Sequence, residues 1–167
     1  SQKKKYTTFT TTGAASMLLS NQKTNLKIES STIGTIVDYG IKDSSNMGAV
    51  MAPSAAATLQ KHLNELNRNI DYYDIVVTGD LGVLGAELFL KLIKEDYNII
   101  PKSYLDAASV LYKDDQETFQ GGSGPVVVPL VLMNKLLKEK KYHRILLLAT
   151  GSLHSTLMVN LKKSIPS

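Results

Sequence analysis

Apolar residues recur along this chain at two spacings, one typical of helices and one typical of strands buried on both faces. Met51, Ala55, Leu59 and Leu63 fall on one face of a predicted helix, for which Pro53 suits the first position. The same spacing predicts two further helices, at Leu84, Leu88 and Leu92 and at Val126, Leu130, Met133 and Leu137. Pro129 lies inside the third pattern, so that helix is expected to start late or to bend.

Short apolar runs lie between these predicted helices. Residues 74–78 read Asp-Ile-Val-Val-Thr and residues 145–149 read Ile-Leu-Leu-Leu-Ala. Residues 109–112 and 157–161 are weaker strand candidates. Strands that are apolar on both faces belong in the middle of a sheet that helices cover on both sides. The pattern therefore predicts a layered α/β fold, with a mixed sheet whose central strands are parallel.

The first 40 residues follow a different pattern. Residues 6–20 and 26–39 are rich in threonine and β-branched residues, and a polar connection at 21–25 separates them. We expect a β-hairpin over residues 1–40, followed by the alternating α/β region at 41–167. No repeat or flexible linker interrupts the chain, so one domain is predicted.

The length, cysteine content and charge of the chain exclude several classes of protein and of functional site. At 167 residues the chain is long enough for a sizeable core, and no apolar run approaches the roughly 20 residues that span a bilayer. The absence of cysteine excludes disulfides, thiolate metal sites and a cysteine nucleophile within this chain. The net charge of +4 comes without an interleaved aromatic pattern, which argues against nucleic-acid binding. We expect a cytosolic protein, or one held peripherally on a membrane.

A glycine loop directly precedes the third predicted helix and is the most suggestive candidate site. It reads Gly121-Gly122-Ser123-Gly124. Free backbone N–H groups and the dipole at a helix start favour an anion such as a carboxylate or a phosphate. The loop lacks the Gly-Lys-Ser/Thr of a phosphate-binding Walker sequence. The alternative is a tight loop whose glycines only ease the packing of helix on sheet, and the residues alone leave both open.

A second glycine turn follows the first buried strand. Gly79 and Asp80 lie at its carboxyl end, where open α/β sheets bind ligands. Asp80 is a candidate to orient a ligand or bind a proton, and the commoner role for aspartate there is to cap the next helix. The turn containing Ser152 follows residues 145–149 in the same way, so three glycine-bearing turns are expected to converge on one edge.

Few other residues suggest chemistry. His154 lies just after the turn at Ser152 and is a candidate site residue, whereas His62 lies among polar residues and is expected to face solvent. Asp106 is a further acidic candidate near a predicted strand. No metal-ligand spacing occurs in the sequence, and no serine, histidine and aspartate stand in the context of a nucleophile elbow. We therefore expect neither a catalytic residue nor a metal site.

Several long, ordered stretches resemble the stage V sporulation protein AD family along nearly the whole chain. Residues 46–53 read Asn-Met-Gly-Ala-Val-Met-Ala-Pro, and residues 71–82 read Asp-Tyr-Tyr-Asp-Ile-Val-Val-Thr-Gly-Asp-Leu-Gly. Further matching stretches are residues 12–15, 31–43, 121–124, 149–151 and 164–167. These stretches are specific to the family rather than generic.

The resemblance implies a thiolase-like fold made of two similar halves. Residues 1–40 would be the last strands of the first half, and residues 41–167 the second half without its final strand. It also implies binding of dipicolinic acid, with calcium as a counter-ion, during uptake into the developing spore. The implied partners are membrane-embedded subunits of an uptake complex and further copies of the chain, at the inner membrane of the forespore or spore.

The chain departs from the family pattern beside the expected pocket. Residues 125–129 replace a stretch with cysteine and small residues, and Ala107 and Ala108 replace Cys-Gly after Asp106. A carboxylate at Asp80 would repel a developing oxyanion, so carbon–carbon condensation is not expected. Two alternatives remain: an acyl-transfer enzyme whose nucleophile lies outside this chain, and a structural subunit that docks on membrane partners.

Overall fold

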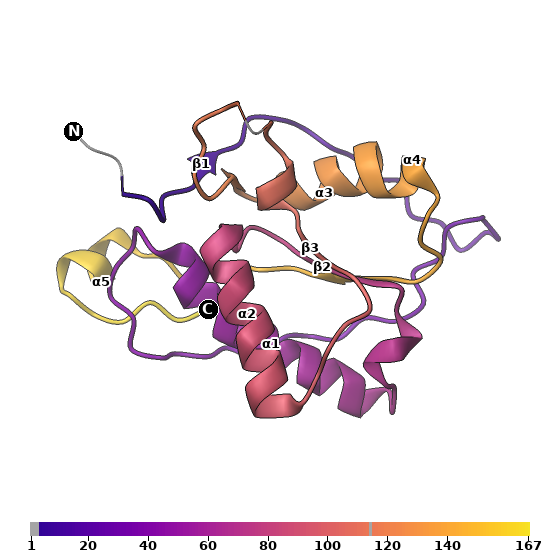
Figure 1. The fold of residues 1–167 in the computed structure, drawn as a ribbon, viewed down its shortest axis with the longest axis horizontal. Helices are drawn as coiled ribbons and strands as arrows, with labels where there is room; N and C mark the ends of the chain where they lie inside the picture. The colour runs from indigo at the N-terminus through magenta and orange to yellow at the C-terminus, as the bar shows by residue number, and fades with distance from the viewer. Residues whose placement is uncertain (1–3, 114) are drawn as a thin grey trace.

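In a computed structural model, which describes residues 4–113 and 115–167, helices cover both faces of a three-stranded parallel sheet (Figure 1). β2 (Ile75–Thr78) is the central strand, with β3 (Tyr104–Asp106) on one side and β5 (Ile145–Leu148) on the other. Thr78 pairs with Asp106 on one side and with Leu148 on the other. Because the three strands are parallel, the turns that follow them meet at one edge of the sheet.

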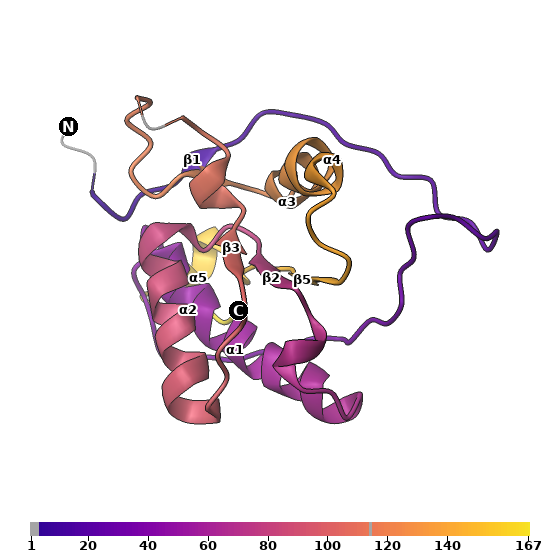
Figure 2. The same ribbon diagram turned by 45° about the vertical axis from the view of Figure 1, so that its right-hand side comes forward.

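The helix layers follow from the side chains of the strands, which point alternately to the two faces of the sheet. Figures 1 and 2 both show α1 (Met47–Glu65) and α2 (Gly82–Tyr97) on one face of the sheet. α3 (Val127–Val131), the π-helical segment η3 (Leu132–Leu136) and α4 (Leu137–Glu139) form a continuous helical stretch on the other face. Val76 joins the core on the α1 and α2 side, while Val77 joins the core on the α3 side. The α/β fold class predicted from the sequence is confirmed.

The helices differ in detail from the sequence predictions. α1 begins at Met47, six residues before Pro53, because the Asn46 side chain accepts a hydrogen bond from the Ala49 N–H and caps the helix there. In α2 the buried face carries Gly85, Ala86, Phe89 and Ile93, whereas Leu84 is 45% exposed. The face is shifted because the two helices cross at glycines: a Cβ on Gly48 would lie 2.8 Å from the Gly85 Cα.

Two strand predictions in the second half of the chain are wrong. Residues 109–112 overlap the short 3₁₀ turn η2 (Ala108–Val110), and the strand lies earlier, at β3. Residues 157–161 overlap the helix α5 (Thr156–Asn160) instead of a strand. Both are short apolar runs, for which periodicity does not separate helix from strand.

The hairpin predicted over residues 1–40 is also wrong. β1 (Phe9–Thr10) pairs in parallel with β4 (Gly122–Ser123), and the rest of residues 4–40 forms no strand. The β-branched residues favour an extended backbone, which residues 29–35 adopt along α1 without a partner strand. Lys61 Nζ donates to the Ile33 carbonyl, and the Thr58 hydroxyl accepts from the Thr35 N–H.

His62 contradicts the expectation that it faces solvent. Its side chain is buried, with Nδ1 2.8 Å from the Thr32 hydroxyl and Nε2 2.6 Å from the Tyr73 hydroxyl. Burial is the main reason that the pKa of His62 is lowered, and the nearby Arg68 lowers it further. His62 therefore belongs to the junction between α1 and the extended segment at residues 29–35.

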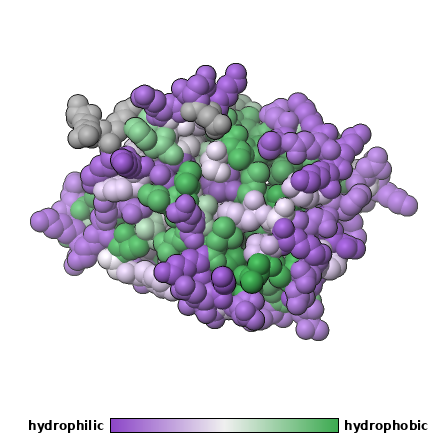
Figure 3. Space-filling model, in the orientation of Figure 1, coloured by the Kyte–Doolittle hydropathy of each residue, from purple (hydrophilic) through white to green (hydrophobic). Residues whose placement is uncertain are grey.

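The surface mixes apolar and polar regions. On the face drawn in Figure 3, hydrophobic residues form patches within a rim of hydrophilic side chains. Among the described residues, no helix has both the length and the apolar character needed to cross a membrane.

Candidate functional site

The Asp80 carboxylate joins the three glycine-bearing turns at the carboxyl edge of the sheet. Its Oδ1 accepts a hydrogen bond from the Thr150 hydroxyl at 2.8 Å. Its Oδ2 accepts from the Gly124 N–H at 2.9 Å and from the Ser123 hydroxyl at 3.3 Å. The predicted convergence of the turns is thus present, and its centre is one carboxylate. We call these three donors, on Ser123, Gly124 and Thr150, the carboxylate cradle.

The strand register explains why the donors meet. Thr78 and Leu148 are paired at the ends of β2 and β5, so Asp80 and Thr150 follow two residues after paired positions. The Thr150 hydroxyl also accepts from the Asp80 N–H at 2.9 Å, which fixes the backbone of the turn. Gly79 is buried beside Thr150, and a Cβ there would overlap the Thr150 hydroxyl.

The glycine loop reaches Asp80 from the other side. Gly122 and Ser123 form β4, which pairs with β1, and Gly121 accepts from the Phe9 N–H. Gly124 then has a φ of 112°, a conformation that favours glycine. This conformation turns the Gly124 N–H toward Asp80, while the loop is fixed to β1 by the preceding residues.

Asp106 caps α2 from a neighbouring strand. Its carboxylate accepts from the Leu81 and Gly82 N–H groups at 3.1 Å and 3.0 Å, and from the Thr78 hydroxyl at 2.7 Å. Gln120 accepts from the Leu84 N–H at 2.7 Å. The capping role that the sequence favoured for Asp80 therefore belongs to Asp106 and Gln120.

Burial sets the ionisation of Asp106. The residue is 2% exposed, and this desolvation raises the pKa of its carboxyl to about 6, against the opposing effect of its three hydrogen bonds. Burial also raises the pKa of the Tyr104 hydroxyl, which lies 2.6 Å from the Thr78 hydroxyl. Because Thr78 gives its proton to Asp106, Tyr104 is the donor in that contact.

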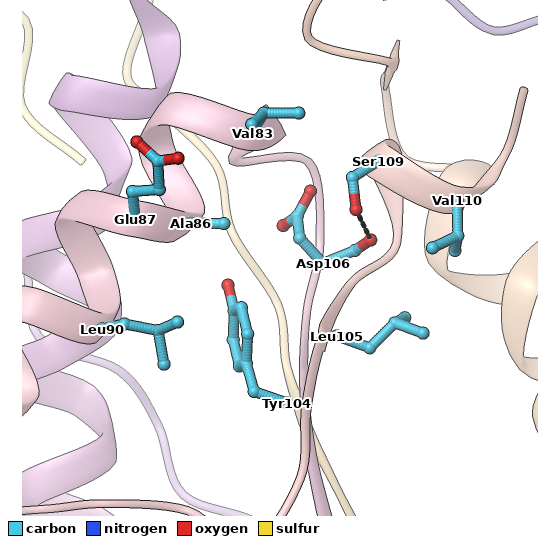
Figure 4. A pocket seen from close by; sticks show the side chains of 9 residues that line it. All are labelled: Val83, Ala86, Glu87, Leu90, Tyr104, Leu105, Asp106, Ser109 and Val110. Carbon is cyan, nitrogen blue, oxygen red and sulfur yellow. Dashed lines mark hydrogen bonds between the residues drawn. The ribbon is translucent and has the colours of Figure 1, made fainter. Parts of the chain in front are cut away.

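A groove of about 320 Å³ lies between α2 and β3, beside Asp106 (Figure 4). Ala86 and Leu90 form its wall on α2, and Tyr104 and Leu105 form the wall on β3. Its polar groups include the carboxylates of Glu87 and Asp106, which favour a cation or a hydrogen-bond donor over an anion. The groove is therefore distinct in chemistry from the carboxylate cradle.

The predicted site residues fall into three groups. Asp80, Ser123 and Gly124 meet in the cradle, with Gly79, Gly121 and Gly122 in its supporting backbone. Asp106 lies behind the cradle as the cap of α2. Ser152 and His154 follow Thr150, and His154 is exposed. No hydrogen bond links either residue to Asp80 in the part of the chain that the structure describes, so their role in binding stays a prediction.

Sequence reasoning missed three residues that build the site. Thr150 lies in a predicted turn, but its hydroxyl was not singled out. Gln120 carries no local signal, because its partner Leu84 is 36 residues away in the sequence. Thr78 is a polar residue at the end of an otherwise apolar strand, which is a signal for this edge of the sheet, but its partner Asp106 is 28 residues away in the sequence.

The cradle is suited to holding a carboxylate. Its donors are one backbone N–H and two hydroxyl groups, they converge on both oxygens of a single carboxylate, and all of them are partly accessible to solvent. Hydrogen bonds to an ionised acceptor are about twice as strong as neutral ones.

Two comparisons with known proteins match this chain along nearly its whole length. A model of the stage V sporulation protein AD family matches residues 1–167. Stage V sporulation protein AD of Bacillus subtilis (strain 168) is 37% identical over 169 residues, covering 99% of this chain and 50% of that protein. The chain thus spans about half the length of the curated relative that it matches.

Proposed function

The chain belongs to the stage V sporulation protein AD family, and on this premise we propose that it acts in bacterial spore formation as a non-catalytic domain that binds dipicolinic acid. The carboxylate cradle is the proposed site for one of the two carboxylates of the ligand. Calcium enters the proposal only as the counter-ion of this dianion.

The single observation that carries the proposal is the convergence of Ser123, Gly124 and Thr150 on one carboxylate. The two hydroxyls come from different segments of the chain: Ser123 lies in β4, which pairs with β1, and Thr150 follows β5, which pairs with β2. Donors fixed in this way recognise a carboxylate at little cost in ordering. The backbone of the cradle is held by the hydrogen bond from the Asp80 N–H to the Thr150 hydroxyl and by the pairing of β1 with β4.

The negative charge at the same edge argues against condensing chemistry. Asp80 is at the turn, with Asp106 behind it, and a developing oxyanion there would meet repulsion instead of stabilisation. Because of this repulsion, we propose that the domain is not an enzyme. Membrane-embedded subunits, further copies of the chain and a peripheral position at the forespore or spore membrane are proposed as its context.

Calorimetric titration of the chain with dipicolinate, with and without calcium, tests the proposal. We expect saturable binding, and we expect Thr150→Val to weaken it about 10- to 100-fold because one hydrogen bond to a charged group is lost. Thr156→Val is the matched control, since Thr156 is exposed on α5 and its hydroxyl has no hydrogen bond within the described ranges.

Two results would count against the proposal. One is the absence of heat beyond dilution at millimolar dipicolinate in both conditions. The other is equal weakening by Thr150→Val and Thr156→Val, which would place the ligand elsewhere on the chain.

A further inference from the structure

We infer that Asp80 is an internal plug of the carboxylate cradle: its side chain occupies the donors of Ser123, Gly124 and Thr150, and a carboxylate ligand binds only when that side chain leaves. The inference rests on the proposed function and adds how the site is closed. Chemically, the competing ligand is any small carboxylate, of which a dicarboxylate is one case.

The contacts of Asp80 are those of a bound ligand. Both of its oxygens are used, at 2.8 Å from the Thr150 hydroxyl and 2.9 Å from the Gly124 N–H. These partners are 70 and 44 residues away in the sequence, so they do not form a local turn motif. An aspartate that only shaped its own turn would bond to neighbouring backbone groups, as Asp43 does with Ser45.

The side chain of Asp80 is free to leave without unfolding its surroundings. The Asp80 N–H is held by the Thr150 hydroxyl, so the backbone of the turn has its own anchor. The first N–H groups of α2 bond to Asp106 and Gln120, so α2 does not depend on Asp80 for a cap. Asp80 is only partly buried, and rotation about its side-chain bonds therefore carries the carboxylate toward water.

Because both are negatively charged, the Asp80 side chain and a carboxylate ligand cannot occupy the cradle at the same time. A second carboxylate in the cradle would share donors with Asp80 and would repel it at close range. Asp106 lies behind the cradle and adds negative charge on the same side. The plug therefore lowers the affinity of the wild-type site for a carboxylate, and its removal is expected to raise that affinity.

Rescue of Asp80→Ala by acetate tests the plug directly. We expect this variant to lose stability, because it leaves three donors without their acceptor, and to regain it with acetate but not with chloride at equal ionic strength. The unfolding midpoint should rise by about 3–6 °C when acetate exceeds its dissociation constant roughly tenfold. The amide resonance of Gly124 should shift along with it, whereas the wild type should show neither effect.

The controls separate the cradle from general effects of acetate. Asp96→Ala removes a carboxylate on the exposed face of α2 that makes no hydrogen bond or ion pair among the described residues, and it should not respond. Asp80→Ala combined with Thr150→Val should lose most of the response, because one of the donors is gone. If Asp80→Ala does not fold alone, refolding in acetate and in chloride gives the same comparison.

The outcomes distinguish this inference from the proposed function. A folded Asp80→Ala that ignores acetate at Gly124, or a variant that refolds in neither salt, overturns the plug. If acetate restores the stability of Asp80→Ala but dipicolinate does not bind, the plug is supported and dipicolinate is excluded as the ligand. Equal dipicolinate affinity of wild type and Asp80→Ala overturns the plug while the proposed function stands.

Discussion

Asp80 and Asp106 lie at the same edge of the sheet, yet their surroundings assign them different roles. Asp106 is buried and holds the start of α2 through the Leu81 and Gly82 N–H groups. Asp80 is half-buried and holds donors from two other turns. The sequence indicated that both acids belong near the site. It did not reveal which one caps the helix, because that depends on the register that sets Asp106 beside Thr78.

The raised pKa of Asp106 predicts a pH dependence of stability. Its carboxyl has a folded-state pKa of about 6 against an ordinary value of 3.8, so the folded protein binds this proton more tightly. The stability gained is complete below about pH 4 and is lost as the pH rises through about 6. At about 1.4 kcal/mol per pKa unit, the loss is of the order of a few kcal/mol.

Urea unfolding from pH 4 to pH 8, for the wild type and for Asp106→Asn, measures this contribution. Asp43 and Glu29 have lowered pKa values and give the opposite slope, so the difference between the two proteins is the quantity of interest. That difference should change through about pH 6. Parallel stability curves would contradict the assignment.

At the scale of elements, the apolar runs located β2 and β5, and the spacing of apolar residues located α1 and α2. The errors arose where partners decide the structure. Residues 29–35 have strand-forming composition but lie alongside α1, held by contacts such as the one between Thr32 and His62. The buried face of α2 was misplaced because Gly85 and Ala86 allow close approach, and neither stands out as apolar.

The cap on α2 predicts a large effect for Gln120. Its side chain accepts from the Leu84 N–H and donates to the Lys5 carbonyl, and it is 8% exposed. Gln120→Ala leaves both groups without this partner and should cost about 1–3 kcal/mol of unfolding free energy. Gln60→Ala, on the exposed face of α1, is the control and should cost less than about 0.5 kcal/mol. Similar losses from both would refute the cap.

Arg68 fastens the extended segment to the end of α1. Its guanidinium donates to the Ser30 and Tyr73 hydroxyls, pairs with Glu29 at 3.2 Å and stacks 4.2 Å from the centre of the Tyr72 ring. Arg68→Ala should therefore release residues 29–32 and speed tryptic cleavage after Lys27. Lys91→Ala, a cation removed from the exposed side of α2, should leave the rate unchanged. An unchanged rate in Arg68→Ala would show that other contacts hold the segment.

At the scale of the whole molecule, the two ends of the sheet differ in character. The carboxyl ends of the strands carry the glycine turns, Asp80 and Asp106. The amino ends carry the cations Lys102 and Arg144, and the Asp74 carboxylate lies beside them and accepts from the His143 and Arg144 N–H groups. An anion held only by charge would be drawn to cationic side chains such as Lys102 and Arg144, away from the two carboxylates Asp80 and Asp106. The position of a bound dicarboxylate is therefore the decisive observation.

An amide-resolved NMR titration with dipicolinate tests the central claim, that the carboxylate cradle is the site of binding. We predict saturable shifts of the Gly124 and Asp80 amides, with the Arg144 amide unaffected at the same concentrations. Shifts at Arg144 and His143 alone, with Gly124 unmoved at saturation, would contradict the account and assign binding to the amino end of the sheet.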